Sequence, residues 1–116
     1  MNALKHTPWS DEITLIYLQT AKDTAGFESV TEVRSNPALY CSWEEGVSQS
    51  EFYRSRKAGM EATAQAEVQT ADYLAFWPAG YTDLRFAEFE GRSFKILRSF
   101  PESFDTTTLI LAEVMR

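Results

Sequence analysis

The chain has 116 residues, of which 44% are hydrophobic and 14% aromatic, a composition that fits one folded domain and excludes a disordered chain. With a formal net charge of -6, the chain lacks the excess of Lys and Arg with which a domain binds nucleic-acid phosphates. The single cysteine, Cys41, excludes an intrachain disulfide and a cysteine-rich zinc site, and it fits a reducing compartment.

The first residues are polar and irregular, and we expect residues 1–11 to form a flexible arm before a single domain at 12–116. Pro8 disfavours regular structure at Thr7. Trp9 is expected to tuck against the core, with an interface anchor as the alternative. The arm has no apolar stretch of the kind a signal peptide carries, and no run approaches the ~20 apolar residues of a membrane span. We therefore expect that the protein does not associate with a membrane and that it is made in a cytoplasm.

Three strands are predicted in the first part of the chain. Glu12–Gln19 and Ala38–Glu45 are rich in β-branched and aromatic side chains. Phe27–Arg34 alternates moderately between apolar and polar residues. The segment Lys22–Gly26 has turn composition, so the second strand is predicted to pair back onto the first.

A short helix is predicted to follow the third strand. Ser48 and Glu51 stand three residues apart, the spacing of a capping box in which each side chain bonds to the backbone N–H of the other residue. Gly59 is placed to end the helix in a left-handed turn. The basic residues Arg54, Arg56 and Lys57 complement the helix dipole near its C-terminus.

The remaining chain reads as strands joined by turns. Tyr73–Pro78 is a short aromatic segment stopped by its proline. Two alternating runs linked by residues 90–92, which include a glycine, form the clearest hairpin signal. The predicted strands are Glu61–Thr70, Asp83–Phe89, Ser93–Phe100 and Thr107–Val114. The fold class is therefore mainly β, a small antiparallel β-barrel of about six or seven strands with one short α-helix inserted mid-chain.

The sequence predicts neither a catalytic nor a metal or cofactor site, and we expect a protein that is not an enzyme. The only histidine, His6, lies in the polar arm, where rigid support for catalysis is missing. Cys41 is predicted to be a small buried residue, because its downstream neighbours Glu44 and Glu45 do not favour a thiolate. Those two glutamates are adjacent on a strand and should point to opposite faces.

The helix instead offers a candidate contact surface. Its basic residues are three of the eleven Lys and Arg residues in an acidic chain. They could therefore bind an acidic partner, which could be another copy of the chain. The alternative is a solvated helix end that only complements the dipole. The candidate contact residues are Glu51, Phe52, Tyr53, Arg54, Arg56 and Lys57.

One segment carries a family resemblance. The run from Cys41 to Met60 is CSWEEGVSQSEFYRSRKAGM. It resembles the pattern C-S-V-x-S-V-S-x-S-E-F-Y-x-A-x-x-A-G-L of small phage head–tail joining proteins, also called head-closure or head–tail adaptor proteins. The runs DEITLIYLQ, FEGRSFKILRSF and TTLILAEV are similar to their opening strand, hairpin and final strand. The likeness spans roughly residues 11–114 and departs around Tyr73–Leu84 and in the first ten residues.

The resemblance implies a structural role in the virion. Such proteins are similar to small β-barrels that assemble as a ring on the portal after DNA packaging. The ring extends and closes the DNA channel and provides the docking surface for the tail. The implied partners are a portal or adaptor ring, a tail-completion protein and further copies of the chain. DNA would pass through without specific binding, and the protein would be made in the cytoplasm of a bacterial host.

Two other readings remain open. A small β-barrel could bind a small molecule or single-stranded nucleic acid, with aromatic side chains as stacking platforms. The candidate platforms are Trp43, Phe52, Tyr53 and Trp77. A small hydrolase would need two converging carboxylates, and no spacing in the sequence singles out such a pair.

Overall fold

The computed structural model describes residues 10–57, 59, 61–77 and 85–115. This part of the chain forms seven strands and two helices, so the predicted mainly β fold is confirmed. In chain order the elements are β1 (Asp11–Lys22), β2 (Glu28–Arg34), β3 (Leu39–Glu45), α1 (Gln49–Lys57), β4 (Ala64–Gln69), α2 (Thr70–Phe76), β5 (Arg85–Phe89), β6 (Arg92–Pro101) and β7 (Thr106–Val114).

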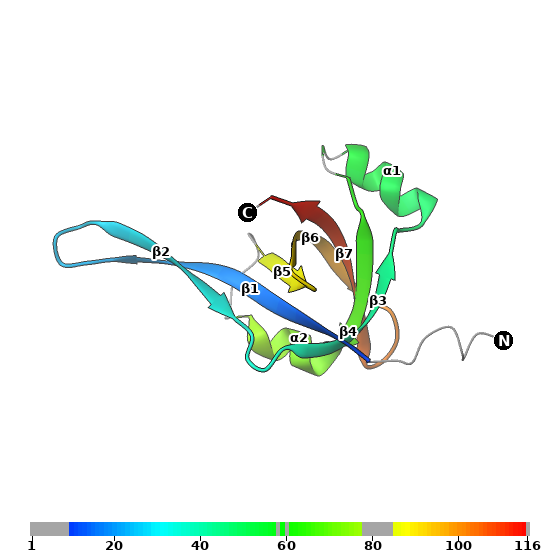
Figure 1. Ribbon diagram of the computed structural model, residues 1–116, viewed down its shortest axis with the longest axis horizontal. Coiled ribbons are helices and arrows are strands. Elements are labelled where there is room, and N and C mark those ends of the chain that lie inside the picture. The colour runs from blue at the N-terminus through cyan, green and yellow to red at the C-terminus, as the bar shows by residue number, and fades with distance from the viewer. Residues whose placement is uncertain (1–9, 58, 60, 78–84, 116) are drawn as a thin grey trace.

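The strands close into a ring of antiparallel pairs (Figure 1). Hydrogen bonding runs from β1 through β3, β4, β7, β6 and β5, and β5 pairs back onto β1. The long strand β1 makes this possible, because different parts of it pair with β3, β5 and β2. Of the seven described strands, β2 alone lies outside the ring. The hydrogen-bonded ring is the closure expected of the small antiparallel barrel predicted from the sequence.

Strand alternation fills the interior of the ring. Ile13, Leu15, Val68, Phe94 and Leu109 are fully buried and belong to one cluster to which the ring strands contribute. Every second residue along a strand points to the same side, so each strand supplies inward side chains at this spacing. The result is one hydrophobic core inside the ring.

The end of β1 and most of β2 form a ribbon that projects from the ring (Figure 1). The pairing continues to Lys22 opposite Glu28, and Asp23 Oδ1 accepts hydrogen bonds from the backbone N–H groups of Ala25 and Phe27 at the turn, each 2.9 Å. The ribbon confirms the predicted pairing of the first two strands. It lies along the long axis of the molecule, whose extents are 61 × 32 × 26 Å (Figure 1).

Helix α2 corrects the sequence prediction, which had one helix and a short aromatic segment here. Tyr73 is buried one turn before Trp77, and its hydroxyl donates to Ser99 Oγ at 3.1 Å and accepts from Arg85 Nη1 at 2.6 Å. The ring of Trp77 also packs against Tyr17 in β1. These contacts to distant strands stabilise a helical turn that aromatic composition alone does not indicate.

The hairpin between β5 and β6 is confirmed. Glu90 and Gly91 form its two-residue connection with φ angles of 50° and 78°. Positive φ at both positions is the backbone of the turn that matches the twist of paired strands, and glycine adopts it without strain.

Some predictions fall outside the described residues. His6, Trp9 and the rest of residues 1–9 are among them, as are residues 78–84. Asp11, which the sequence analysis assigned to the arm, is instead the first residue of β1 and pairs with Cys41.

Candidate functional site

Helix α1 begins at the predicted cap. Ser48 Oγ accepts a hydrogen bond from the backbone N–H of Glu51 at 3.2 Å, and the Ser48 carbonyl accepts one from Phe52 N at 3.0 Å. The serine therefore satisfies an N–H group that the first turn of a helix leaves without an intrahelical partner. At the other end, Gly59 has φ +87°, the left-handed conformation predicted for it.

The carboxylate of Glu51 has a partner that the sequence analysis did not predict. We expected it to turn back to Ser48, and it instead forms a two-point ion pair with the Arg98 guanidinium of β6. The Nε–Oε1 distance is 3.1 Å. Hydrogen bonding from Arg98 lowers the pKa of Glu51, with a smaller contribution from the charge of Arg54. The pair fastens α1 to the ring through a side chain that is only 14% exposed.

The geometry of α1 divides the predicted contact residues between two sides. Successive residues on a helix are about 100° apart, so Tyr53 lies about 200° from Glu51, on the side away from Arg98. Arg56 lies one turn after Phe52, and its guanidinium carbon is 5.6 Å from the centre of that ring. Arg54 lies about 200° from Arg56, and its charge acts on Glu51 instead.

We call Phe52, Tyr53 and Arg56 the outer face of α1. Tyr53 is 56% exposed, Arg56 is exposed, and the Phe52 and Tyr53 rings meet edge to face at 6.2 Å. Lys57 occupies the helix position one turn after Tyr53. The outer face therefore combines aromatic surface with positive charge.

The positive charge of the outer face is not neutralised within the described part of the chain. Arg34, Arg92 and Arg98 each form ion pairs there, and Arg85 donates to Tyr73. Arg56 has a contact with an aromatic ring and no ion pair among the described residues. An exposed cation beside exposed aromatic rings is the composition of a contact surface, since Tyr and Arg are enriched at the energetic centres of interfaces.

An acidic groove lies across β3, β4 and β7. Its volume is about 430 Å³, and its walls are Ser42, Trp43, Glu44, Gln65, Glu67, Glu102 and Thr108. A second hollow shares Glu44 and Gln65 with it and continues to Ser48. Glu44 accepts a hydrogen bond from Gln65 Nε2 at 2.8 Å, and Glu102 accepts one from Thr108 Oγ1 at 2.9 Å. We call Glu44, Glu67 and Glu102 the acidic groove.

This groove was not predicted, because no spacing in the sequence singles out carboxylates that converge. Strand alternation does place Glu44 on the side opposite the core residue Cys41, and Glu67 opposite Val68. Their proximity, however, depends on the pairing of Ser42 with Glu67 and of Glu44 with Gln65. That register becomes known only when the two strands are paired.

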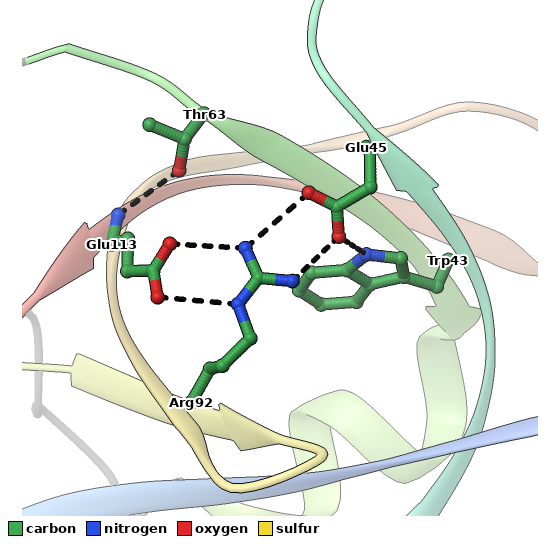
Figure 2. Close-up of polar contacts among 5 residues, drawn as sticks. All are labelled: Trp43, Glu45, Thr63, Arg92 and Glu113. Atoms are coloured by element: carbon green, nitrogen blue, oxygen red, sulfur yellow. Dashed lines mark hydrogen bonds and ion pairs between the residues drawn. The ribbon is translucent and has the colours of Figure 1, made fainter.

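A second polar cluster holds one end of the ring together (Figure 2). The Arg92 guanidinium lies between Glu45 and Glu113, with Nη1–Oε2 and Nη2–Oε1 distances of 2.7 and 3.0 Å respectively. Trp43 Nε1 also donates to Glu45 at 2.6 Å, and Glu113 N donates to Thr63 Oγ1 at 3.0 Å. The cluster joins β3, β6 and β7, and its hydrogen bonds from Arg92 lower the pKa of both glutamates.

Cys41 is buried, as predicted. Its side chain is fully inaccessible, and burial together with the nearby charges of Asp11 and Glu12 raises the pKa of the thiol to about 12. A thiol with that pKa is protonated at neutral pH and is a poor nucleophile or metal ligand. The described residues contain no group of three or more His, Cys, Asp or Glu side chains placed to hold a metal ion.

Two of the four candidate stacking platforms, Trp43 and Trp77, are packed against aromatic rings that the ring strands contribute. The indole of Trp43 stacks on Phe89 with ring centres 3.8 Å apart and an angle of 3° between the planes. Trp77 meets Tyr17 and Tyr73 with ring centres 6.2 and 5.6 Å apart. The exposed aromatic surface at this site therefore comes from α1, with Tyr53 as its most accessible ring.

Comparison with known proteins adds no assignment. No family model matches the chain, and the curated proteins contain no match to its sequence. Among the helices that the structure describes, none is long and apolar enough to cross a membrane.

Proposed function

We propose that this chain is a structural protein of a phage neck. Its copies assemble as a ring on the portal, extend and close the DNA channel after packaging, and give the tail its docking surface. The proposal is supported by the resemblance of residues 11–114 to head–tail joining proteins, which is most specific between Ser48 and Gly59. The role is non-enzymatic, and it places the protein in the virion.

The outer face of α1 is the observation that carries the proposal. The segment with the most specific resemblance folds into a capped helix, and the Glu51–Arg98 pair holds this helix on the ring. Tyr53 and Arg56 are thereby presented to solvent on a support that loses little conformational freedom when a partner binds. A helix of this kind suits a protein that acts by docking.

The charge of the chain suits a DNA conduit. With a net charge of -6 the protein has no excess of cations with which to hold the phosphate backbone. A channel component has to let DNA pass, so weak electrostatic attraction to DNA is an advantage there. The partners in this proposal are a portal or adaptor ring, a tail-completion protein and neighbouring copies of the chain.

Binding to portal rings tests the proposal. The purified protein is mixed with portal rings encoded in the same genome, and the mixture is analysed by co-sedimentation and electron microscopy. We expect co-sedimentation and an added layer of density on one end of the portal. Portal rings from an unrelated phage are the control. Failure to bind the portal or any other neck component of the same genome would rule out the proposed function.

The alternative, a β-barrel module that binds single-stranded nucleic acid, has a separate test. Tyrosine and tryptophan fluorescence is followed while oligonucleotides are added at low ionic strength. Stacking of bases on Tyr53 would quench the emission. We expect no quenching, since the net charge of the chain opposes accumulation of phosphates.

A further inference from the structure

We infer that the outer face of α1 in one copy docks into the acidic groove of a second copy of this chain. This inference deepens the proposed ring assembly and rests on it, because it names the two surfaces that meet between neighbouring subunits. Phe52, Tyr53 and Arg56 form one surface, and Glu44, Glu67 and Glu102 line the other.

Charge complementarity selects the second copy as the occupant. Arg56 forms no ion pair among the described residues, and Glu44 and Glu102 accept hydrogen bonds from the uncharged side chains of Gln65 and Thr108. Among the described residues, the chain therefore displays a cation on one surface, Arg56, and two carboxylates on the other, Glu44 and Glu102, that have no oppositely charged partner. Complementary potentials of this kind steer encounter and fix the orientation of two partners.

The contact cannot form within one molecule. Glu51 holds the inner side of α1 on β6, so Tyr53, about 200° around the helix, faces away from the ring of its own chain. The hollow that continues the groove reaches Ser48, at the start of the same helix, and the helix cannot turn over to fill it. The outer face of α1 is therefore left for the groove of a neighbouring molecule.

The geometry of such a contact leads to a closed ring or a filament. Each copy uses its helix on one side and its groove on the other, which is a heterologous contact in which different surfaces meet. Every added copy again exposes one free surface of each kind. Head-to-tail growth of this type is what ring assembly requires, and the portal would select closure at a given number of copies.

Self-association measured without the portal tests the inference. Sedimentation velocity over a concentration series at low ionic strength is expected to show oligomers of the unmodified chain. The association should weaken when the ionic strength is raised to about 1 M, where charges are screened beyond about 3 Å. Arg56→Glu is expected to weaken association about tenfold, because it places like charges opposite each other. The double substitution Glu44→Lys with Glu102→Lys should weaken it to a similar degree.

Mixing the two variants gives the sharper result. In an alternating assembly the reversed helix of one variant meets the reversed groove of the other, and both remaining surfaces are native. An equimolar mixture should therefore regain association to within about threefold of the unmodified chain, although each variant alone associates about tenfold more weakly. Circular dichroism of each variant checks that it is folded. If the lysine variant fails to fold, Glu44→Gln with Glu102→Gln tests the groove by self-association alone, because a neutral groove cannot complement Arg56→Glu in the mixture.

Matched controls carry the same charge change elsewhere. Arg54→Gln and Arg56→Gln differ only in the side of α1 that they alter, and only Arg56→Gln should weaken association. Glu28→Lys on the projecting ribbon is the control for the single groove substitution Glu44→Lys, which changes the net charge by the same amount. These pairs separate a local contact from the general effect of changing the net charge.

Three results would overturn the inference. They are an unmodified chain that stays monomeric at high concentration and low ionic strength, variants that associate like the unmodified chain, and a mixture of the two variants that fails to regain association. Portal binding is scored separately. A monomeric chain that still binds the portal would refute the subunit contact and leave the proposed function standing. Self-association without portal binding would support the subunit contact and refute the proposed function.

Discussion

The Glu51 carboxylate receives two hydrogen bonds from the Arg98 guanidinium, although the two residues are 47 positions apart in the chain. Glu51 belongs to the first turn of α1 and Arg98 to β6, so one ion pair fixes the helix relative to the ring. The orientation of the outer face, and with it the proposed docking, depends on this pair.

Replacing Glu51 by Gln should lower the free energy of unfolding by about 1 kcal/mol. A hydrogen-bonded charge pair contributes about 1.5–3 kcal/mol, and the value is reduced here because the Arg98 side chain is 35% exposed. Urea denaturation followed by circular dichroism measures the change. Glu28→Gln on the exposed ribbon is the matched control and should have no measurable effect. Equal stabilities of the two variants would show that the pair does not hold the helix.

The stability difference between the unmodified chain and Glu51→Gln should depend on pH. Hydrogen bonding from Arg98 lowers the pKa of Glu51 in the folded state below its ordinary value of 4.5. A carboxylate with a lowered folded pKa stabilises the folded state above the unfolded pKa, and that contribution is lost as pH falls through the folded pKa. The difference should therefore be full at pH 6–7 and shrink steadily at pH values below about 4.5. A difference that stays constant down to about pH 2 would contradict the assigned interaction.

The cap of α1 gives a further test. Ser48→Ala removes the acceptor for the Glu51 N–H and should cost about 1 kcal/mol of stability. Thermal unfolding measures the loss, and Ser48→Asp, which keeps an acceptor, should restore most of it. Unchanged unfolding of Ser48→Ala would show that the helix start does not depend on this cap.

Features with local signals were predictable from the sequence, and those that depend on distant partners were not. The β5–β6 hairpin and the Ser48 cap are encoded within a few residues, by alternation around Gly91 and by the spacing to Glu51. Helix α2 is stabilised by contacts of Tyr73 with Ser99 and Arg85, so its own segment carries only a weak helix signal.

In the candidate site, too, features with local signals were predictable and features that depend on distant partners were not. The sequence placed the candidate contact residues on a helix but grouped Arg54 with Arg56, and helix geometry places these two residues on opposite sides. The partner of Glu51 and the acidic groove depend on which strands pair and in which register. Pairing of that kind joins residues far apart in the chain and leaves no local pattern.

The thiol of Cys41 should be inert in the folded protein. Its side chain is fully buried, and burial raises its pKa to about 12, so very little thiolate is present at pH 8. A thiol-reactive chromogenic disulfide should label the protein in about 6 M guanidinium chloride and react at least a hundredfold more slowly without it. Since the chain has one cysteine, the signal is unambiguous. Rapid labelling of the folded protein would mean that the strand pairing around Cys41 opens readily.

The polar cluster around Arg92 at the end of the ring should determine the pKa values of Glu45 and Glu113. Hydrogen bonds from Arg92 are the main cause of the lowered pKa values of Glu45 and Glu113, and the bond from Trp43 adds to the effect at Glu45. In Arg92→Gln both pKa values should rise toward the ordinary value of 4.5, and Glu45 should keep part of its shift because the Trp43 contact remains.

Carboxyl resonances followed by nuclear magnetic resonance during an acid titration measure both groups directly. Arg34→Gln is the matched control, since Arg34 pairs with Glu32 and Glu88 and contacts neither glutamate of the cluster. A larger remaining shift at Glu113 than at Glu45 would contradict the geometry, because only Glu45 has the indole as a second donor. The expected order thus tests whether Arg92 bridges β3 and β7 in solution or pairs with one strand alone.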